Sequence, residues 1–350
     1  MDQGQPEEEK SKRSTVSRRT FLKLLIAGAA AVGGIMSLDF LYPKPTNPEL
    51  RTVTPTTAKV TASTFSTTPS SKGASVVVVR GSASVKPAVL VERALESLGG
   101  VEKIVPSGAS IFVKPNVGFY DKEAATDPRV VVAVVNCLKR ALPSQIVAGE
   151  SSVRGNDTEY ALQVTGMRSI VGETGVEVRD LRKDQAVNVS IPKGKAMSSV
   201  NVFKTVRDSS FIVDMPRLKR HSATTITISL KNMMGTVPDS EKGRFHQVNL
   251  NQCIADLNSV LRPSLVIIDA TNVMTKRGPT GGTMVELNTV IASLDPVAAD
   301  IVAAEELFKA EGVTDPAASA GRVEHIQMAA ELGVGVADRS KIEIVEVKIS

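Results

Sequence analysis

The sequence predicts an α/β protein with a mostly parallel, doubly wound sheet that helices cover on both faces. Short runs of apolar, β-branched residues recur along the chain, as in Ser75–Arg80, which reads Ser-Val-Val-Val-Val-Arg. Segments with a helical hydrophobic period lie between these runs. Short buried strands that alternate with helices are typical of parallel sheets, whose strands are shielded from water on both sides.

The expected elements follow one another regularly from residue 75 to residue 347. A helix is expected at 128–142, because Asp127 is a favourable cap and Pro128 suits the first helical position. Strands are expected at 75–80, 110–113, 145–148, 176–180, 211–215, 265–269, 287–293 and 342–347. Further helices are expected at 86–98, 157–173, 224–234, 250–261, 296–308 and 317–332. The polar, alternating stretch 181–210 predicts a small β insertion.

Residues 1–45 have the form of a twin-arginine export signal or membrane anchor. Ser17–Lys23 places Arg18 and Arg19 before Thr-Phe-Leu-Lys. The run Leu24–Leu38 is 15 residues of mostly apolar or small character, which is short for a membrane span and typical of a signal's hydrophobic region. We therefore expect the Tat translocase to be a partner during export and the location to be extracytoplasmic.

Residues 46–73 are rich in Thr, Ser and Pro and predict a linker, because this composition buries little apolar surface. No clear Ala-x-Ala cleavage site follows the hydrophobic region. An uncleaved N-terminal segment that anchors the protein to a membrane is therefore one alternative, and cleavage is the other. Residues 74–350 form the predicted α/β domain.

The charge of the chain argues against binding to nucleic acid. The chain holds 42 Lys and Arg against 37 Asp and Glu, but ten of the basic and six of the acidic residues lie within 1–75. The rest is close to neutral and lacks the basic excess that nucleic-acid binding requires. The chain has two cysteines, Cys137 and Cys253, which are either buried free thiols or a disulfide. Two cysteines are too few to hold an iron–sulfur cluster.

Polar residues follow the predicted strands at the point where each strand ends. Ligands of open α/β sheets bind beyond the carboxyl ends of the strands. We therefore expect these residues to surround one cleft, with most of them as ligand-binding residues. The residues that follow the strands directly are Lys114, Asn116, Glu150, Ser151, Asp214 and Asp269.

A basic segment follows the strand at 211–215 and contains two of the chain's three histidines. Its density of cations suits a carboxylate or phosphate ligand. Arg217, Lys219 and Asn232 are candidates for ligand binding. His221, His246 and Lys231 are candidates for catalysis, since His transfers protons near neutral pH.

The sequence is compatible with a bound divalent metal ion, and it does not identify any other cofactor. His246 and Asp214 are the candidate ligands. Asp295 and Asp300 form a second carboxylate pair, although a helix cap explains Asp295. His325 lies in a late helix, and we expect it to lie away from the cleft.

The chain resembles the domain-of-unknown-function family 362 over residues 110–300. The matching residues are Lys114-Pro115-Asn116, Ala125-Thr126-Asp127-Pro128, Gly149-Glu150-Ser151, Lys219, His221, Lys231-Asn232, Gly235, Lys242, His246, Asp269, Gly278-Pro279, Ser293, Asp295-Pro296 and Asp300. Many relatives carry ferredoxin-type iron–sulfur modules, whose cysteines this chain lacks.

A smaller set of residues is similar to the lactate racemase family. His221, Lys231 and His246 match that family in order and rough spacing. The resemblance implies that Lys231 carries a covalent nickel-pincer nucleotide, that His246 ligates the nickel, and that His221 acts as acid and base. The surrounding sequence departs from that family.

The leading hypothesis is an exported enzyme that acts on a small anionic molecule, a carboxylate or a phosphate, through a cleft of His and Lys residues. One alternative is a non-catalytic extracytoplasmic protein that binds an anionic ligand. The other is an enzyme that depends on a nickel-pincer cofactor, like the racemases.

Overall fold

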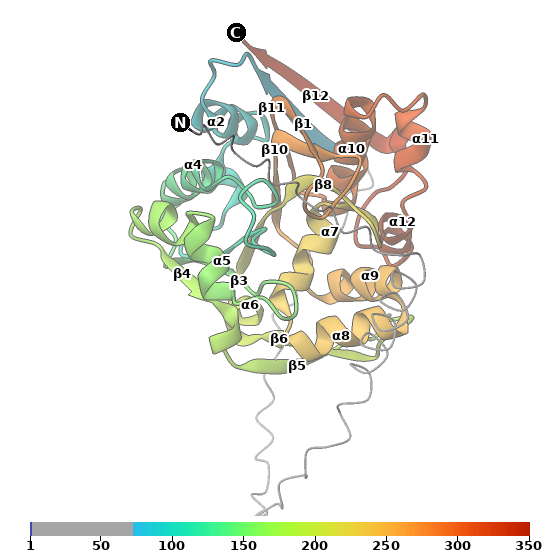
Figure 1. The fold of residues 1–350 in the computed structure, drawn as a ribbon. Coiled ribbons are helices and arrows are strands. Elements are labelled where there is room, and N and C mark those ends of the chain that lie inside the picture. The colour runs from blue at the N-terminus through green and yellow to red at the C-terminus, as the bar shows by residue number, and fades with distance from the viewer. Residues whose placement is uncertain (2–72) are drawn as a thin grey trace, which may run out of the picture. The chain divides into compact units, whose positions relative to one another are not determined.

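The computed structural model describes Met1 and residues 73–350. The predicted export signal, membrane anchor and most of the linker lie outside the described residues. Within 73–350, the expected α/β architecture is confirmed: a mixed, mostly parallel sheet lies between two layers of helices (Figure 1). Among the described helices, none is long and apolar enough to cross a membrane.

The main sheet has the strand order β12-β1-β11-β10-β7-β2-β3-β4, and β8 and β9 extend it beside β10. Strand β11 runs antiparallel to both of its neighbours, whereas β7, β2, β3 and β4 form a parallel set. The bounds of these strands are β1 Ala74–Gly81, β2 Ser110–Pro115, β3 Gln145–Glu150, β4 Glu177–Asp180, β7 Phe211–Met215, β8 Arg217–His221, β9 Thr225–Thr227, β10 Leu265–Thr275, β11 Thr283–Ser293 and β12 Ile342–Ile349.

Helices cover both faces of this sheet, so the doubly wound arrangement is confirmed. The helices are α2 Pro87–Ser97, α3 Val101–Ile104, α4 Pro128–Lys139, α5 Thr158–Val164, α6 Lys204–Asp208, α7 Ser229–Asn232, α8 Asp239–Val248, α9 Leu250–Val260, α10 Pro296–Ala310, α11 Pro316–Ala320 and α12 Glu324–Glu331. Asp127 caps α4 as expected, because its side chain accepts a hydrogen bond from the Arg129 amide.

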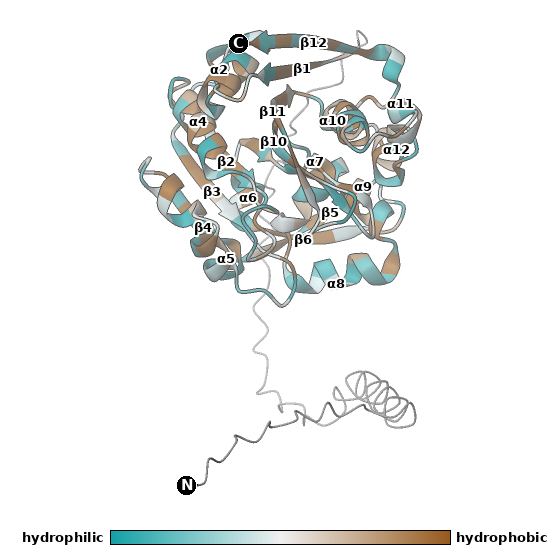
Figure 2. Cartoon of the chain, turned by 45° about the horizontal axis from the view of Figure 1, so that its top comes forward, coloured by the Kyte–Doolittle hydropathy of each residue, from teal (hydrophilic) through white to brown (hydrophobic). Residues whose placement is uncertain are grey.

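Two hydrophobic clusters lie on opposite faces of the sheet, because successive side chains of a strand alternate between its faces. In β1, Val76 and Val78 belong to one cluster and Val77 and Val79 to the other. Hydrophobic colour marks the inner strands in Figure 2, whereas α8 is largely hydrophilic. Cys137 and Cys253 are both buried as free thiols.

The β insertion is confirmed as a two-stranded antiparallel sheet, β5 (Ala186–Ser190) with β6 (Ser199–Phe203). Two carboxylates attach it to the helices. Glu241 of α8 accepts hydrogen bonds from the backbone and side chain of Asn201, at 3.1 and 2.7 Å. Asp256 of α9 accepts hydrogen bonds from the backbone N–H groups of residues 195–197.

The predicted helix at 224–234 is wrong. Thr225–Thr227 forms β9, which pairs with β8 as a hairpin, and only Ser229–Asn232 is α-helical. Thr225 has a positive φ of 69°, which a continuous helix does not permit. The predicted helix at 157–173 is likewise interrupted at Gly166, and the one at 317–332 is divided into α11 and α12.

Candidate functional site

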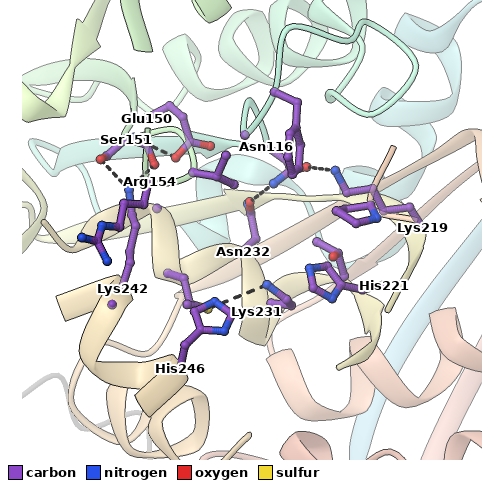
Figure 3. Close-up of a pocket in the computed structure, with 18 of the residues that line it drawn as sticks. Asn116, Glu150, Ser151, Arg154, Lys219, His221, Lys231, Asn232, Lys242 and His246 are labelled. Carbon is purple, nitrogen blue, oxygen red and sulfur yellow. Dashed lines mark hydrogen bonds between the residues drawn. The ribbon is translucent and has the colours of Figure 1, made fainter. Parts of the chain in front are cut away.

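A cavity of about 400 Å³ lies where β8, α7, α8 and the loops after β2 and β3 meet (Figure 3). Its walls combine several cations with a few apolar groups. The lining residues are Asn116, Gly118, Phe119, Glu150, Ser151, Val153, Arg154, Lys219, His221, Thr227, Lys231, Asn232, Met234, Gly235, Lys242, Gly243, His246, Gln247 and Pro279.

Strand β8 supplies two of these groups, Lys219 and His221. They lie two positions apart, so their side chains leave the same face of the strand, which here faces the cavity. Nδ1 of His221 accepts a hydrogen bond of 3.1 Å from the Ala223 amide. The neutral ring therefore carries its proton on Nε2, which leaves Nε2 as the donor.

The short helix α7 supplies Lys231 and Asn232, and a distant carboxylate fixes it. Asp300 of α10 is fully buried and accepts hydrogen bonds from the backbone N–H groups of Ser229 and Leu230, at 2.8 and 3.0 Å. These two groups belong to the first turn of α7, whose N–H groups have no partner within the helix. Asp300 therefore sets the position from which Lys231 extends.

A buried ion pair lies beneath the cavity. Nζ of Lys114 is 2.8 Å from Oε2 of Glu150, and both side chains are almost completely buried. Glu150 also accepts hydrogen bonds from the backbone N–H groups of Val117 and Ser151, both at 2.8 Å. The carboxylate thereby holds together the loops that follow β2 and β3.

Two asparagines connect this ion pair to the cavity wall. Oδ1 of Asn232 accepts hydrogen bonds from Lys114 at 3.3 Å and from Nδ2 of Asn116 at 2.7 Å. Nδ2 of Asn232 donates to Asp214 at 2.7 Å. Oδ1 of Asn116 accepts a hydrogen bond from Lys219 at 2.7 Å. Each amide group thus has a fixed orientation, because one end accepts and the other donates.

The cations that line the cavity differ in how many partners they have. Lys242 donates to the carbonyl groups of Ser151 and Ser152 and to the Ser151 hydroxyl, at 2.6–2.7 Å, so all three of its protons are engaged. By contrast, the sulfur of Met234, at 3.8 Å, is the one hydrogen-bond partner of Lys231 among the described residues. Arg154 has no hydrogen bond or ion pair to any residue of the described range. Lys231 and Arg154 are therefore the cations that are open to a ligand.

Burial lowers the pKa values of the amines and imidazoles around the cavity. It lowers the pKa of Lys231 to about 8. Burial also lowers the pKa of His221 to about 3, with further contributions from the charges of Lys231 and Lys219. The pKa of the exposed His246 is lowered by burial of its ring and by Lys231. Both imidazoles are therefore neutral near pH 7.

Most of the site residues predicted from the sequence line this one cavity, including the two histidines. They are Asn116, Glu150, Ser151, Lys219, His221, Lys231, Asn232 and His246. Arg154 also lines it and is not among the residues predicted from the sequence. Its position after the β3 end, in Glu150-Ser-Ser-Val-Arg, was the available signal.

Four predicted site residues lie outside the cavity lining and pair with one another or with the cavity wall. Arg217 is 2.5 Å from Asp269, which also accepts hydrogen bonds from the Asp127 amide at 2.8 Å and the Thr271 hydroxyl at 2.6 Å. This pair joins β8 and β10 to the start of α4. Lys114 and Asp214 belong to the network beneath the cavity. Burial raises the pKa of Asp214 to about 7.

His325 also lies outside the cavity lining, as the sequence predicted. It is fully buried in α12, and neither ring nitrogen has a hydrogen-bond partner among the described residues.

The two carboxylates considered as a second metal site both bind backbone N–H groups. Asp295 caps α10, and Asp300 holds α7. Within residues 73–350, no group of three or more His, Cys, Asp or Glu side chains is arranged to hold a metal ion. Asp214 and His246 therefore do not form part of such a group.

Gly235 is the position where the backbone passes closest to the buried ion pair. A Cβ atom there would lie 2.0 Å from Oε1 of Glu150 and 2.6–2.7 Å from the end of Lys114. We expect Gly235→Ala to cost about 1–3 kcal/mol of the free energy of unfolding, because the pair has no room to move. Urea denaturation measures this cost.

Gly243→Ala is the matched control for Gly235→Ala. The added atom in α8 would meet only the flexible end of Arg154, at 3.3 Å. Because Ala favours a helix interior by about 1 kcal/mol over Gly, this variant should be neutral or more stable. Equal destabilisation of both variants would contradict the assignment of the close contact.

Residues 111–305 match the sequence profile of a family described as a domain of unknown function, DUF362. This match covers more than half of the chain. The chain belongs to the DUF362 family. A curated relative, a thylakoid-associated protein of Synechocystis, is 25% identical over 217 residues, which is 59% of this chain and 66% of that protein. This DUF362 chain thus spans slightly under two thirds of that relative's length.

Two solved structures match part of the DUF362 chain at low TM-scores. The lactate racemase apoprotein of Thermoanaerobacterium thermosaccharolyticum is 13% identical with a TM-score of 0.40, over 63% of this chain and 54% of that one. A structural-genomics protein of Thermotoga maritima is 10% identical with a TM-score of 0.38, over 66% of this chain and 59% of that one.

Proposed function

We propose that this protein is an enzyme that acts on a small anionic molecule, a carboxylate or a phosphate, in the cavity at β8 and α7. The observation that carries the proposal is the set of unpaired cations in one cavity. Lys231 and Arg154 line it, and no ion pair joins either of them to a carboxylate of the described residues. The carboxylate that lines the cavity, Glu150, is already paired with Lys114.

The histidines give this cavity the means for proton transfer as well as binding. His221 is neutral with its proton on Nε2, so it can donate a hydrogen bond to a carbonyl or carboxylate oxygen. His246 is exposed at the cavity and neutral near pH 7, so it can accept a proton. An enzyme needs such groups, whereas a binding protein needs only the cations.

Lys231→Ala should weaken the binding of anions by about 1.5–3 kcal/mol, or roughly 10- to 150-fold in Kd, the scale of a charge-assisted hydrogen bond. Calorimetry with pyruvate, citrate and inorganic phosphate measures the change. Lys103→Ala removes an exposed lysine outside the cavity lining and should leave Kd unchanged. An equal Kd for wild type and Lys231→Ala would remove Lys231 from the binding site.

The same titrations distinguish an enzyme from a non-catalytic binding protein. In an enzyme, His246→Gln should abolish turnover of a ligand found in this way while the variant still binds it. If the wild type binds the ligand and leaves it unchanged, the protein is an anion-binding protein.

A nickel-pincer enzyme is a second candidate, because Lys231, His221 and His246 line the same cavity. Lys231 fits as an anchor, since it has no oxygen or nitrogen partner among the described residues, and the exposed His246 fits as one metal ligand. Such a cofactor would supply the metal centre. The mass of the protein purified from its native source decides the question: a covalent nucleotide adds its mass at Lys231, and an unmodified Lys231 excludes this candidate.

Export through the Tat translocase is part of the proposal. Replacing Arg18 and Arg19 with Lys should leave the precursor in the cytoplasm, because recognition depends on the arginine pair. Cell fractionation with detection of the full chain measures the location. The control replaces Lys10 and Lys12 with Arg, which keeps the charge outside the motif. Unchanged export of the double Lys variant would exclude this route.

A further inference from the structure

Lys219 has an environment that differs from those of the other cavity lysines. Its side chain is 1% exposed, and its Nζ lies 5.6 Å from the centre of the Phe119 ring. Nζ donates to Oδ1 of Asn116 at 2.7 Å and to the carbonyl oxygen of Ala124 at 2.6 Å. Both acceptors are neutral, so neither one stabilises a positive charge as a carboxylate would.

The charged groups around Lys219 also disfavour its protonated form. Its pKa is lowered to about 7, mainly by burial and with contributions from the charges of Lys231 and Arg217. Glu150 and Asp121 act in the opposite direction. The carboxylate of Glu150 already has three partners, because it pairs with Lys114 and accepts hydrogen bonds from two backbone N–H groups. It makes no direct ion pair with Lys219.

The two hydrogen bonds match the needs of a neutral amine. A neutral amine has two hydrogens and one lone pair, and Asn116 and Ala124 take both hydrogens. The lone pair is then left for a molecule in the cavity that Lys219 lines. A buried, neutral lysine beside another cation is the usual form of a lysine that attacks carbonyl groups.

We propose that Lys219 forms a Schiff base with a small substrate that carries both a carbonyl group and an anionic group. The proposal rests on the proposed function, because Lys231 and Arg154 would bind the anionic group. His221, two residues along the same strand face, lies beside Lys219 in the cavity wall (Figure 3), and its Nε2 can donate to the carbonyl oxygen. The substrate class is therefore a 2-oxo acid or a keto phosphate.

The reaction balances without any further reagent. The Nζ lone pair forms a bond to the carbonyl carbon, and one amine proton passes by way of Nε2 of His221 to the oxygen, which becomes a hydroxyl. The second amine proton follows the same route, and the C–O bond breaks to release water while the C=N bond forms. The products are the imine, one molecule of water and a neutral His221, and Nζ no longer donates its hydrogen bonds to Asn116 and Ala124.

The test uses the full chain with sodium cyanoborohydride at pH 7, which reduces an imine to a stable secondary amine. Pyruvate and dihydroxyacetone phosphate are the probes, and they distinguish a carboxylate from a phosphate as the anionic group. Acetone, which has the carbonyl alone, is the control compound. Peptide mapping by mass spectrometry then locates the adduct.

The adduct is expected on Lys219 ahead of every other lysine. At pH 7 an ordinary lysine has roughly a thousandfold smaller neutral fraction, and a pKa of about 8 gives Lys231 and Lys242 a neutral fraction roughly fivefold smaller than that of Lys219. Lys219→Arg should abolish it, and Lys103→Arg should leave it unchanged. If Lys219→Arg does not fold, the map of the wild type decides alone. An adduct on Lys231, or one spread evenly over exposed lysines, would overturn the proposal.

Calorimetry separates this proposal from the proposed function. Binding of pyruvate or phosphate that depends on Lys231, together with no adduct on Lys219, would overturn the Schiff base and leave the anion site intact. Absence of both binding and adduct would overturn both.

Discussion

Glu150→Gln is expected to cost about 3–5 kcal/mol of the free energy of unfolding, because it removes the carboxylate that pairs directly with the buried Lys114 charge. The two side chains are 2% and 0% exposed, and their charged atoms lie 2.8 Å apart. Within residues 73–350, Lys114 keeps its hydrogen bonds to the Pro115 carbonyl and to Asn232 and its charge interaction with Asp214. Urea denaturation of wild type and variant measures the loss.

Glu177→Gln is the matched control. Glu177 pairs with Arg179 at 2.7 Å, but its side chain is 53% exposed. Water screens such a pair, so its loss should cost only about 0–1 kcal/mol. A double variant, Lys114→Met with Glu150→Gln, should recover part of the loss, since it removes the unpaired charge. A cost below about 1 kcal/mol for Glu150→Gln alone would show that Lys114 finds another partner.

The same substitution should also affect the cavity, because the pair holds Asn232 and, through it, Asn116. Asn116 accepts one of the two hydrogen bonds of Lys219. The buried pair is therefore a structural support for the cations that contact a ligand, and not itself a group that contacts one. Its stability effect should be accompanied by weaker anion binding even under conditions where the variant stays folded.

The sequence predicted the sheet and its large helices because their signals are local. Runs of β-branched residues and Asp-Pro helix starts depend on neighbours in the chain, and Asp127 and Asp295 act as caps. The segment 224–234 was mispredicted because its conformation depends on distant groups. Asp300, some 70 residues away, binds the first turn of α7. No pattern within 224–234 contains that information.

The location of the site was predictable from the sequence, but the pairing of its individual residues was not. The rule that ligands bind at the carboxyl ends of strands brought His221, Lys231 and His246 together in one cavity. It did not show which strand-end residues face the cavity and which pair beneath it. Lys114 and Asp269 each follow a strand signal, yet each has a buried partner from another strand. Pairing across the sheet depends on register and side-chain direction, which a single sequence does not fix.

His325→Leu is expected to remove one of the two large histidine contributions to the acid sensitivity of this protein, the other being that of His221. Burial lowers the pKa of His325 to about 3, and Lys231 contributes to the shift. The unfolded chain binds a proton at the ordinary pKa of about 6.5. Between these values the unfolded state holds one proton more than the folded state, so the free energy of unfolding falls as the pH falls from about 6.5 toward 3.

The slope of this loss is on the order of 1 kcal/mol per pH unit for one such group, and His325→Leu should lower the slope by that amount. Near pH 8 the variant should keep the wild-type stability, because among residues 73–350 neither ring nitrogen has a hydrogen bond to lose. The raised pKa values of Asp214 and Asp300 act in the opposite direction, but they are present in both proteins and cancel in the difference.

His246→Gln, at an exposed histidine, should change the slope less. Urea denaturation at pH 8, 6 and 5 tests the prediction, and parallel curves for wild type and His325→Leu would show that His325 takes up its proton in the folded state.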